Sequence, residues 1–163
     1  MLGWWAGKIR RTWKYARARV SAQERADLEG WVTPDQLSLF NGMHVADRRH
    51  CLDVVAALRA TGAQEPDLLV AGLLHDCGKG PRMRFCHRVA WSLGQRYGEW
   101  VWRWSGRLPT FRTGLERLRT HAERSAELAA QAGCTPRTVS LIRLQENPID
   151  DAGELLLAAD EAC

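Results

Sequence analysis

Apolar residues recur at helical spacing along most of the chain. Between Ala46 and Thr61 they fall three and four positions apart, and Gly62 follows as a C-terminal stop. This spacing predicts an amphipathic helix. A second helix is predicted from Pro66 to Cys77, with Gly78 ending it. Apolar residues cover most of the circumference of this second helix, so we expect it to run through the centre of the domain.

Helix-capping sequences place further boundaries, and strand signals are nearly absent. Ser21–Glu24 and Thr33–Gln36 have the pattern of capping boxes, each of which predicts the start of a short helix. Other helices are predicted as patches within 84–97, as one long helix over 112–132, from Thr135-Pro136, and from Asp150 or Asp151 to about Glu161. The predicted fold class is all-α. It consists of one helical bundle over 44–163 and an extension over 1–43 that contains an extra basic N-terminal helix.

The composition is that of one globular domain. Of the 163 residues, 45% are hydrophobic and 26% are charged, which excludes a disordered or collagen-like chain. The longest apolar run, 68–74, is much shorter than the roughly 20 residues of a membrane-spanning helix, and no stretch has the pattern of a signal peptide. Five scattered cysteines without a C-x-x-C pair indicate reduced thiols. We therefore expect a cytoplasmic protein.

Charge alternates along the chain, although the net charge is only +4. Residues 1–20 carry six basic and no acidic residues, and residues 81–120 carry nine basic and two acidic ones. Residues 21–80 carry five basic and nine acidic residues, and residues 121–163 carry three and eight. Such alternation suits a site that receives an anion, or a face that meets anionic lipid or nucleic acid.

Two histidines and two aspartates occupy positions where their polar groups need partners. His75 and Asp76 are adjacent at the end of the most buried predicted helix, where burial and the helix dipole both disfavour a carboxylate. An isolated pair of this kind is more often a hydrogen-bonded core pair. However, His50 lies near the apolar face of the preceding helix, and Asp160 follows the apolar stretch 155–159. Together the four side chains suit a divalent ion such as Mn, Fe, Co, Ni, Zn or Mg.

The same residues carry a resemblance to a known family. Arg49–Val54 reads RHCLDV, Leu73–Lys79 reads LLHDCGK, and Ala158–Asp160 reads AAD. These segments resemble the H…HD…D signature of the HD-domain metal-dependent phosphohydrolases, and the resemblance covers residues 44–162. It implies an all-α HD-type bundle in which one divalent metal ion is held by His50, His75, Asp76 and Asp160.

The resemblance also implies hydrolysis of a phosphomonoester or phosphodiester, with a nucleotide as the expected substrate and a metal-activated water as the attacking group. As catalytic residues, Asp76 would orient that water or accept its proton, and Lys79 would contact the phosphate. Further substrate contacts are expected from Arg49, His87 and His121. The alternative function is a non-catalytic HD-type module that serves as a ligand-binding or membrane-proximal scaffold.

The chain departs from the pattern of the binuclear members of the family. Many of them have two further histidines between the HD pair and the last aspartate. Only His121 fits here, and Leu144 and Gln145 stand where another histidine is expected. One metal ion is therefore preferred to two.

Aromatic and basic residues are mixed in two segments that the metal site leaves unexplained. Residues 1–20 contain three tryptophans and suit packing onto the domain or peripheral contact with the anionic inner face of a membrane. Nucleic acid is not expected as a partner, because no recognisable nucleic-acid-binding motif is present. Trp91, Trp100, Trp102 and Trp104 present the same choice and also suit the wall of a substrate pocket.

Overall fold

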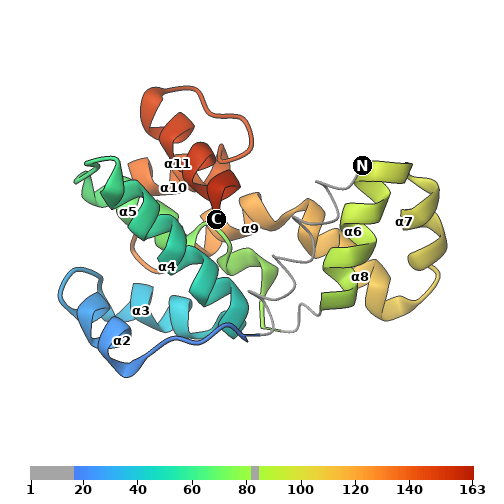
Figure 1. Ribbon diagram of the computed structural model, residues 1–163, viewed down its shortest axis with the longest axis horizontal. Coiled ribbons are helices and arrows are strands. Elements are labelled where there is room, and N and C mark those ends of the chain that lie inside the picture. Colours follow the sequence, from blue (N-terminus) through green and yellow to red (C-terminus); the bar gives the residue numbers. More distant parts are fainter. Residues whose placement is uncertain (1–16, 82–84) are drawn as a thin grey trace.

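The structure is a computed structural model that describes residues 17–81 and 85–163 (Figure 1). Within those ranges the regular elements are all helices, which confirms the all-α prediction. The α-helices are α2 (Ala22–Glu29), α3 (Pro34–Asn41), α4 (Val45–Ala60), α5 (Pro66–Leu74), α6 (Phe85–Tyr97), α7 (Trp100–Ser105), α8 (Pro109–Arg119), α9 (His121–Gln131), α10 (Pro136–Arg143) and α11 (Asp151–Ala162), and the short 3₁₀ helix η1 spans Cys77–Lys79. Across the described part of the chain, none of these helices combines the length and the apolar character that crossing a bilayer requires. Most of the predicted basic helix in residues 1–20 lies outside the described residues.

Local capping signals set several helix starts where the sequence predicts them. The Ser21 hydroxyl accepts the Glu24 backbone N–H, and the Glu24 carboxylate accepts the Ser21 backbone N–H in return. Thr33 and Gln36 form the same reciprocal pair at the start of α3. Asp150 caps α11 through its carboxylate. These contacts satisfy amide groups that the first turn of a helix leaves without an intrahelical partner.

Helix α5 is the centre of the bundle. Its residues from Leu68 to Leu74 are all buried, and it packs against α4, α10 and α11. Gly72 allows the close approach of α4, because a Cβ atom at this position would lie 2.9 Å from Cδ1 of Leu58. This packing holds the helix that carries His50 against the helix that leads to His75.

The end of α5 differs from the prediction. The α-helix stops at Leu74 rather than at Cys77, and Asp76 adopts φ −100° and ψ 1° before η1 begins. The backbone N–H of Gly78 donates to the hydroxyl of Ser125 in α9, at 2.8 Å, instead of continuing the helix. The turn between α5 and η1 is therefore held by a contact with α9.

The long helix predicted over 112–132 is wrong: the structure has two helices, α8 and α9, separated at Thr120. Thr120 has φ −108° and ψ 10°, and its hydroxyl donates to the carbonyl oxygen of Glu116 at 2.9 Å. Nδ1 of His121 lies 2.8 Å from the carbonyl oxygen of Leu118 and donates to it. Side-chain donors thus provide hydrogen bonds to carbonyl oxygens in the last turn of α8. The break between the helices places His121 at the start of α9.

Helices α6, α7 and α8 pack against one another and lie to one side of the bundle in Figure 1. The tryptophan-rich segment is helical here, with Trp100 and Trp104 exposed and Trp102 packed inward against Gly94. Helix α8 also contacts η1 and α9. The group of three helices therefore joins the bundle next to the HD pair.

Candidate metal centre

Three separate parts of the fold bring the four predicted ligands into one cluster. His50 lies in α4, His75 and Asp76 lie between α5 and η1, and Asp160 lies in the last turn of α11. Nε2 of His50 is 2.7 Å from Oδ1 of Asp160, and Nε2 of His75 is 3.5 Å from the same oxygen. The carboxylate of Asp76 lies 3.6 Å from Nε2 of His75 and 4.0 Å from Nε2 of His50.

Two polar atoms at the centre of this cluster are buried and have no hydrogen-bond partner among the described residues: Nε2 of His75 and Oδ1 of Asp76. Each of these residues is only 1% exposed. Nδ1 of His75 lies 2.9 Å from the carbonyl oxygen of Gly72 and donates to it, so the lone pair of the neutral ring is on Nε2. Because buried polar atoms nearly always have partners, this arrangement fits a cation bound between the two atoms.

The carboxylates of the cluster favour their charged forms. Burial alone would raise the pKa of Asp76, but the charges of Lys79 and His75 hold it well below its usual range. Burial likewise opposes ionisation of Asp160, but the hydrogen bond from His50 and the charge of His75 lower its pKa. Burial would lower the pKa of His75, but the charge of Asp76 raises it well above the usual value. The negative charge of the cluster is thus balanced by the proton on His75 and by the ammonium of Lys79. A divalent ion can take over this balancing role.

Lys79 lies at the cluster, bound to one of the predicted ligands. Its Nζ is 2.5 Å from Oδ2 of Asp76, and its side chain is 15% exposed. The spacing of three residues across η1 brings the two groups together. The ammonium therefore faces the carboxylate on the side away from the unpartnered Oδ1.

His121 lies next to Asp76 because η1 and α9 approach very closely. A Cβ atom on Gly78 would lie 2.4 Å from the carbonyl oxygen of His121, so only glycine fits there. Nε2 of His121 is 3.8 Å from Oδ1 of Asp76. Burial and the charge of Lys79 lower the pKa of His121, which favours the neutral imidazole.

A second group of possible ligand atoms contains Cys51, His75 and Asp76. As in the group of His50, His75 and Asp160, the ligand atoms lie within 4.8 Å of one another. Burial raises the pKa of the Cys51 thiol, and its Sγ faces Nδ1 of His75, the nitrogen that donates to Gly72. The thiol is therefore a poor ligand, and the two-histidine, two-aspartate set is favoured.

A cavity of about 320 Å³ opens over the cluster. His50, Asp76 and Asp160 form part of its wall. Among the described residues, three basic side chains also line it, and they are Lys79, Arg49 and Arg88. An anionic group that entered this cavity would meet both the ligand cluster and these cations.

Arg49 reaches the cavity with its charge already balanced by two carboxylates. It forms an ion pair with Glu24 of α2, and Nη2 lies 2.9 Å from Oδ1 of Asp53 in its own helix. The hydrogen bond from Arg49 is the main reason that the pKa of Glu24 is lowered to about 2. Arg49 therefore ties α2 to α4 at the rim of the cavity.

Arg88 lines the cavity, and the sequence analysis did not name it. The sequence analysis named the neighbouring residue His87 as a substrate contact. Arg88 of α6 forms an ion pair with Asp47, a buried residue in the first turn of α4. His87 is 5% exposed and packs edge-on against Phe111, with ring centroids 5.0 Å apart. Among the described residues that line the cavity, His87 does not appear. A partner 41 residues away leaves no local signal at Asp47.

Gln145 has a structural role, and it is one of the two residues, with Leu144, that stand where the sequence resemblance leads us to expect a further histidine. It is buried, and its side-chain Nε2 donates to the backbone carbonyl oxygen of His75 at 3.3 Å. This bond helps to hold the turn that carries His75 and Asp76. The sequence analysis noted Gln145 only because it stands where a histidine was expected. That mismatch is the sequence signal that could have pointed to Gln145.

Comparisons of this chain with protein-family models, with curated proteins and with solved structures found no match.

Proposed function

We propose that this protein is a metal-dependent phosphohydrolase that acts on a phosphomonoester or phosphodiester, with a nucleotide as the expected substrate. The observation that carries the proposal is a pair of buried atoms without a hydrogen-bond partner among the described residues, Nε2 of His75 and Oδ1 of Asp76. Asp76 also lines a cavity with basic side chains. A purely structural cluster has no need to bury the carboxylate of Asp76 and leave one of its oxygens without a donor.

The residues that would hold the ion are His50, His75, Asp76 and Asp160. When bound by these residues, a divalent ion would supply a water molecule of lowered pKa and a Lewis-acid contact to a phosphoryl oxygen. Asp76 is the carboxylate that we assign to orienting the attacking water or accepting its proton. Its second oxygen is held by Lys79 at 2.5 Å, so the carboxylate is fixed in orientation before substrate arrives.

The cations of the cavity would bind the phosphate group. Lys79 is the first cation that we assign to the phosphate, because it lines the cavity beside Asp76. Arg88 is the second cation that we assign to the phosphate, because a guanidinium carries five donors and can bind Asp47 and an anion at the same time. Arg49 contributes less, since Glu24 and Asp53 already balance its charge.

The test is phosphate release from nucleotides, cyclic nucleotides and simple phosphate esters, with Mn, Co, Ni or Mg added. The Asp76→Asn variant keeps the volume of the buried side chain, and we expect it to lose about a hundredfold or more in turnover. The matched control is Asp27→Asn, because Asp27 is an exposed carboxylate on α2, and it should leave turnover unchanged.

Two outcomes would contradict the proposal. Wild-type turnover in Asp76→Asn would remove Asp76 from the mechanism. Absence of turnover with every substrate, in a protein that binds one divalent ion per chain, would support the non-catalytic HD-type scaffold instead.

A further inference from the structure

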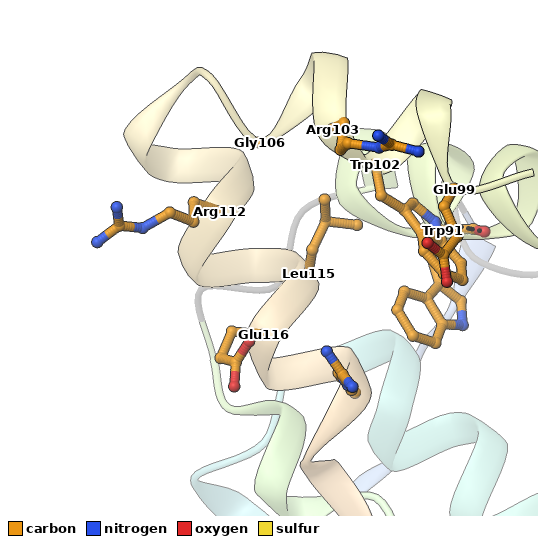
Figure 2. Close-up of a pocket in the computed structure, with 9 residues that line it drawn as sticks. Trp91, Glu99, Trp102, Arg103, Gly106, Arg112, Leu115 and Glu116 are labelled. Carbon is orange, nitrogen blue, oxygen red and sulfur yellow. Dashed lines mark hydrogen bonds between the residues drawn. The ribbon is translucent and has the colours of Figure 1, made fainter.

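A second cavity lies between α6, α7 and α8 (Figure 2). Its volume of about 470 Å³ falls within the range of roughly 300–1,000 Å³ that small-molecule sites occupy. In the described part of the chain it shares no lining residue with the metal cavity. It is therefore a separate candidate site, on the three helices that carry the tryptophan-rich segment.

Two stacked indole rings form one wall of this second cavity. Trp91 of α6 and Trp102 of α7 have ring centroids 4.7 Å apart and planes inclined by 15°. Nε1 of Trp102 donates to the carbonyl oxygen of Trp91 at 3.3 Å. A Cβ atom on Gly94 would lie 1.7 Å from that same nitrogen, so Gly94 provides the space that the indole occupies. The aromatic wall is thus held in place before any ligand binds.

The rest of the wall mixes an excess of basic side chains with two carboxylates. Figure 2 shows Leu115 of α8 pointing toward the indole pair, with Arg103 above Trp102 and Glu99 beside Trp91. The charged residues that line the cavity are Arg103, Arg112, Arg119, Glu99 and Glu116. Among the described residues of the lining, three arginines against two glutamates make the site favourable for an anion. The segment 81–120 that contains the site is also strongly basic.

We propose that this cavity binds a mononucleotide, that is, a planar aromatic base joined through a sugar to a phosphate. The base stacks against the indole wall, where base–aromatic contacts tolerate any base because every base has a π-face. The phosphate is bound by the arginines, whose planar donors match phosphate oxygens. The carboxylates of Glu99 and Glu116 accept hydrogen bonds from sugar hydroxyls or exocyclic amino groups. This site goes beyond the proposed function and does not depend on a metal ion.

The experiment is isothermal titration of the full chain with AMP in the presence of EDTA, which keeps divalent ions out of the metal centre. Adenosine lacks the phosphate and ribose 5-phosphate lacks the base, so both are titrated beside AMP. We expect AMP to bind at least tenfold more tightly than either fragment. Trp91→Leu should weaken AMP binding about tenfold or more, because stacking on the indole wall is lost.

Further variants separate recognition from folding. Trp91→Phe keeps an aromatic ring and should bind AMP more tightly than Trp91→Leu. The double variant R103Q/R119Q should weaken AMP binding while leaving the weaker adenosine binding unchanged. The matched controls are Trp104→Leu and Arg107→Gln, which change exposed residues that do not line this cavity and stack on each other instead.

Three results would overturn the proposal. The first is absence of AMP binding by the wild-type chain. The second is equal AMP affinity in the wild type and in a folded Trp91→Leu variant, as judged by circular dichroism. The third is binding of a single-stranded oligonucleotide without binding of AMP, which would assign the surface to nucleic acid. None of these results bears on the proposed hydrolysis, because the titration is carried out without metal.

Discussion

At the residue scale, the orientation of one imidazole decides what the HD pair can do. His75 follows the last residue of α5, and its Nδ1 donates to Gly72 one turn back in the same helix. That bond leaves Nε2 facing Asp76 and Asp160, at 3.6 and 3.5 Å. In the proposed metal site, the tautomer of His75 is therefore set by the fold.

We expect the affinity of the site for a divalent ion to rise with pH. His75 must be neutral to bind through Nε2, and its pKa is raised well above the usual value in the metal-free protein. The pKa values of Asp76 and Asp160 are lowered, so these groups hold no proton near neutral pH. One proton is then displaced for each ion, and affinity should increase about tenfold for each pH unit below the pKa of His75.

Calorimetric titration with Mn²⁺ or Zn²⁺ in buffers of different ionisation enthalpy measures the number of protons released. An affinity that does not change with pH would show that the ion displaces no proton from His75. This result would contradict the role of His75 as a ligand.

Arg88 should affect substrate binding more than the chemical step. Arg88→Met removes a charge-assisted contact of about 1.5–3 kcal/mol, so KM should rise about tenfold or more with a smaller change in kcat. Asp47→Asn should raise KM less, because the guanidinium is retained but no longer held by a carboxylate. Steady-state kinetics on the substrate found in the panel measures both constants.

The control for Arg88 is Arg59→Met, since the guanidinium of Arg59 stacks over Trp31 and does not line the cavity. A fall in kcat at unchanged KM in Arg88→Met would place Arg88 outside phosphate binding.

At the element scale, helix boundaries set by local bonds were predictable, and boundaries set by tertiary contacts were not. The capping pairs at Ser21 and Thr33 lie within four residues, so the sequence contains the whole interaction. The break at Thr120 depends on packing, because the apolar periodicity continues from α8 into α9. The end of α5 depends on a hydrogen bond from Gly78 to Ser125, 47 residues away. The clustering of His50, His75, Asp76 and Asp160 was predictable through the motif, whereas the Asp47–Arg88 pair was not.

Gly78→Ala should disturb the contact between η1 and α9. The added Cβ would lie 2.4 Å from the carbonyl oxygen of His121 and 2.7 Å from the backbone nitrogen of Ser125, and backbone atoms cannot yield as a flexible side chain can. We expect the free energy of unfolding to fall by about 2 kcal/mol, together with weaker metal binding. Urea denaturation measures the first effect and metal titration the second.

The matched control is Gly30→Ala at the end of α2. Gly30 has φ −76°, and its nearest neighbour would lie 3.5 Å from the new Cβ. The change should therefore alter stability by no more than about 0.5 kcal/mol. Equal stability of the two variants would contradict the close approach at Gly78.

At the scale of the whole molecule, the alternation of charge along the chain corresponds to a division of roles. The proposed metal ligands come from the two acidic segments, 21–80 and 121–163. The basic segment 81–120 supplies Arg88 to the metal cavity and the arginines of the second cavity. The Asp47–Arg88 ion pair joins the acidic segment 21–80 to the basic segment 81–120. The Glu24–Arg49 ion pair joins two helices within the segment 21–80.

The Glu24–Arg49 pair should make a small, pH-dependent contribution to stability. The pKa of Glu24 is lowered from 4.5 to about 2, so its contribution is present above pH 4.5 and is lost as the pH falls toward 2. The Glu24 side chain is 36% exposed, and solvent screening limits the effect to less than about 1 kcal/mol. Glu24→Gln should therefore be less stable than the wild type at neutral pH and equally stable near pH 2.

Urea denaturation of both proteins across this pH range measures the difference. A stability gap that persists unchanged to the lowest pH would show that the carboxylate charge is not its cause.

The most direct test of the metal centre is crystallography of the protein grown with Mn²⁺, with data collected for anomalous scattering. The proposal predicts one strong anomalous peak per chain, within bonding distance of Nε2 of His75 and of the carboxylate of Asp76, with His50 and Asp160 completing the ligand set. An ordered Mn²⁺ bound elsewhere, or no ordered ion in this cluster at saturating Mn²⁺, would contradict the central claim.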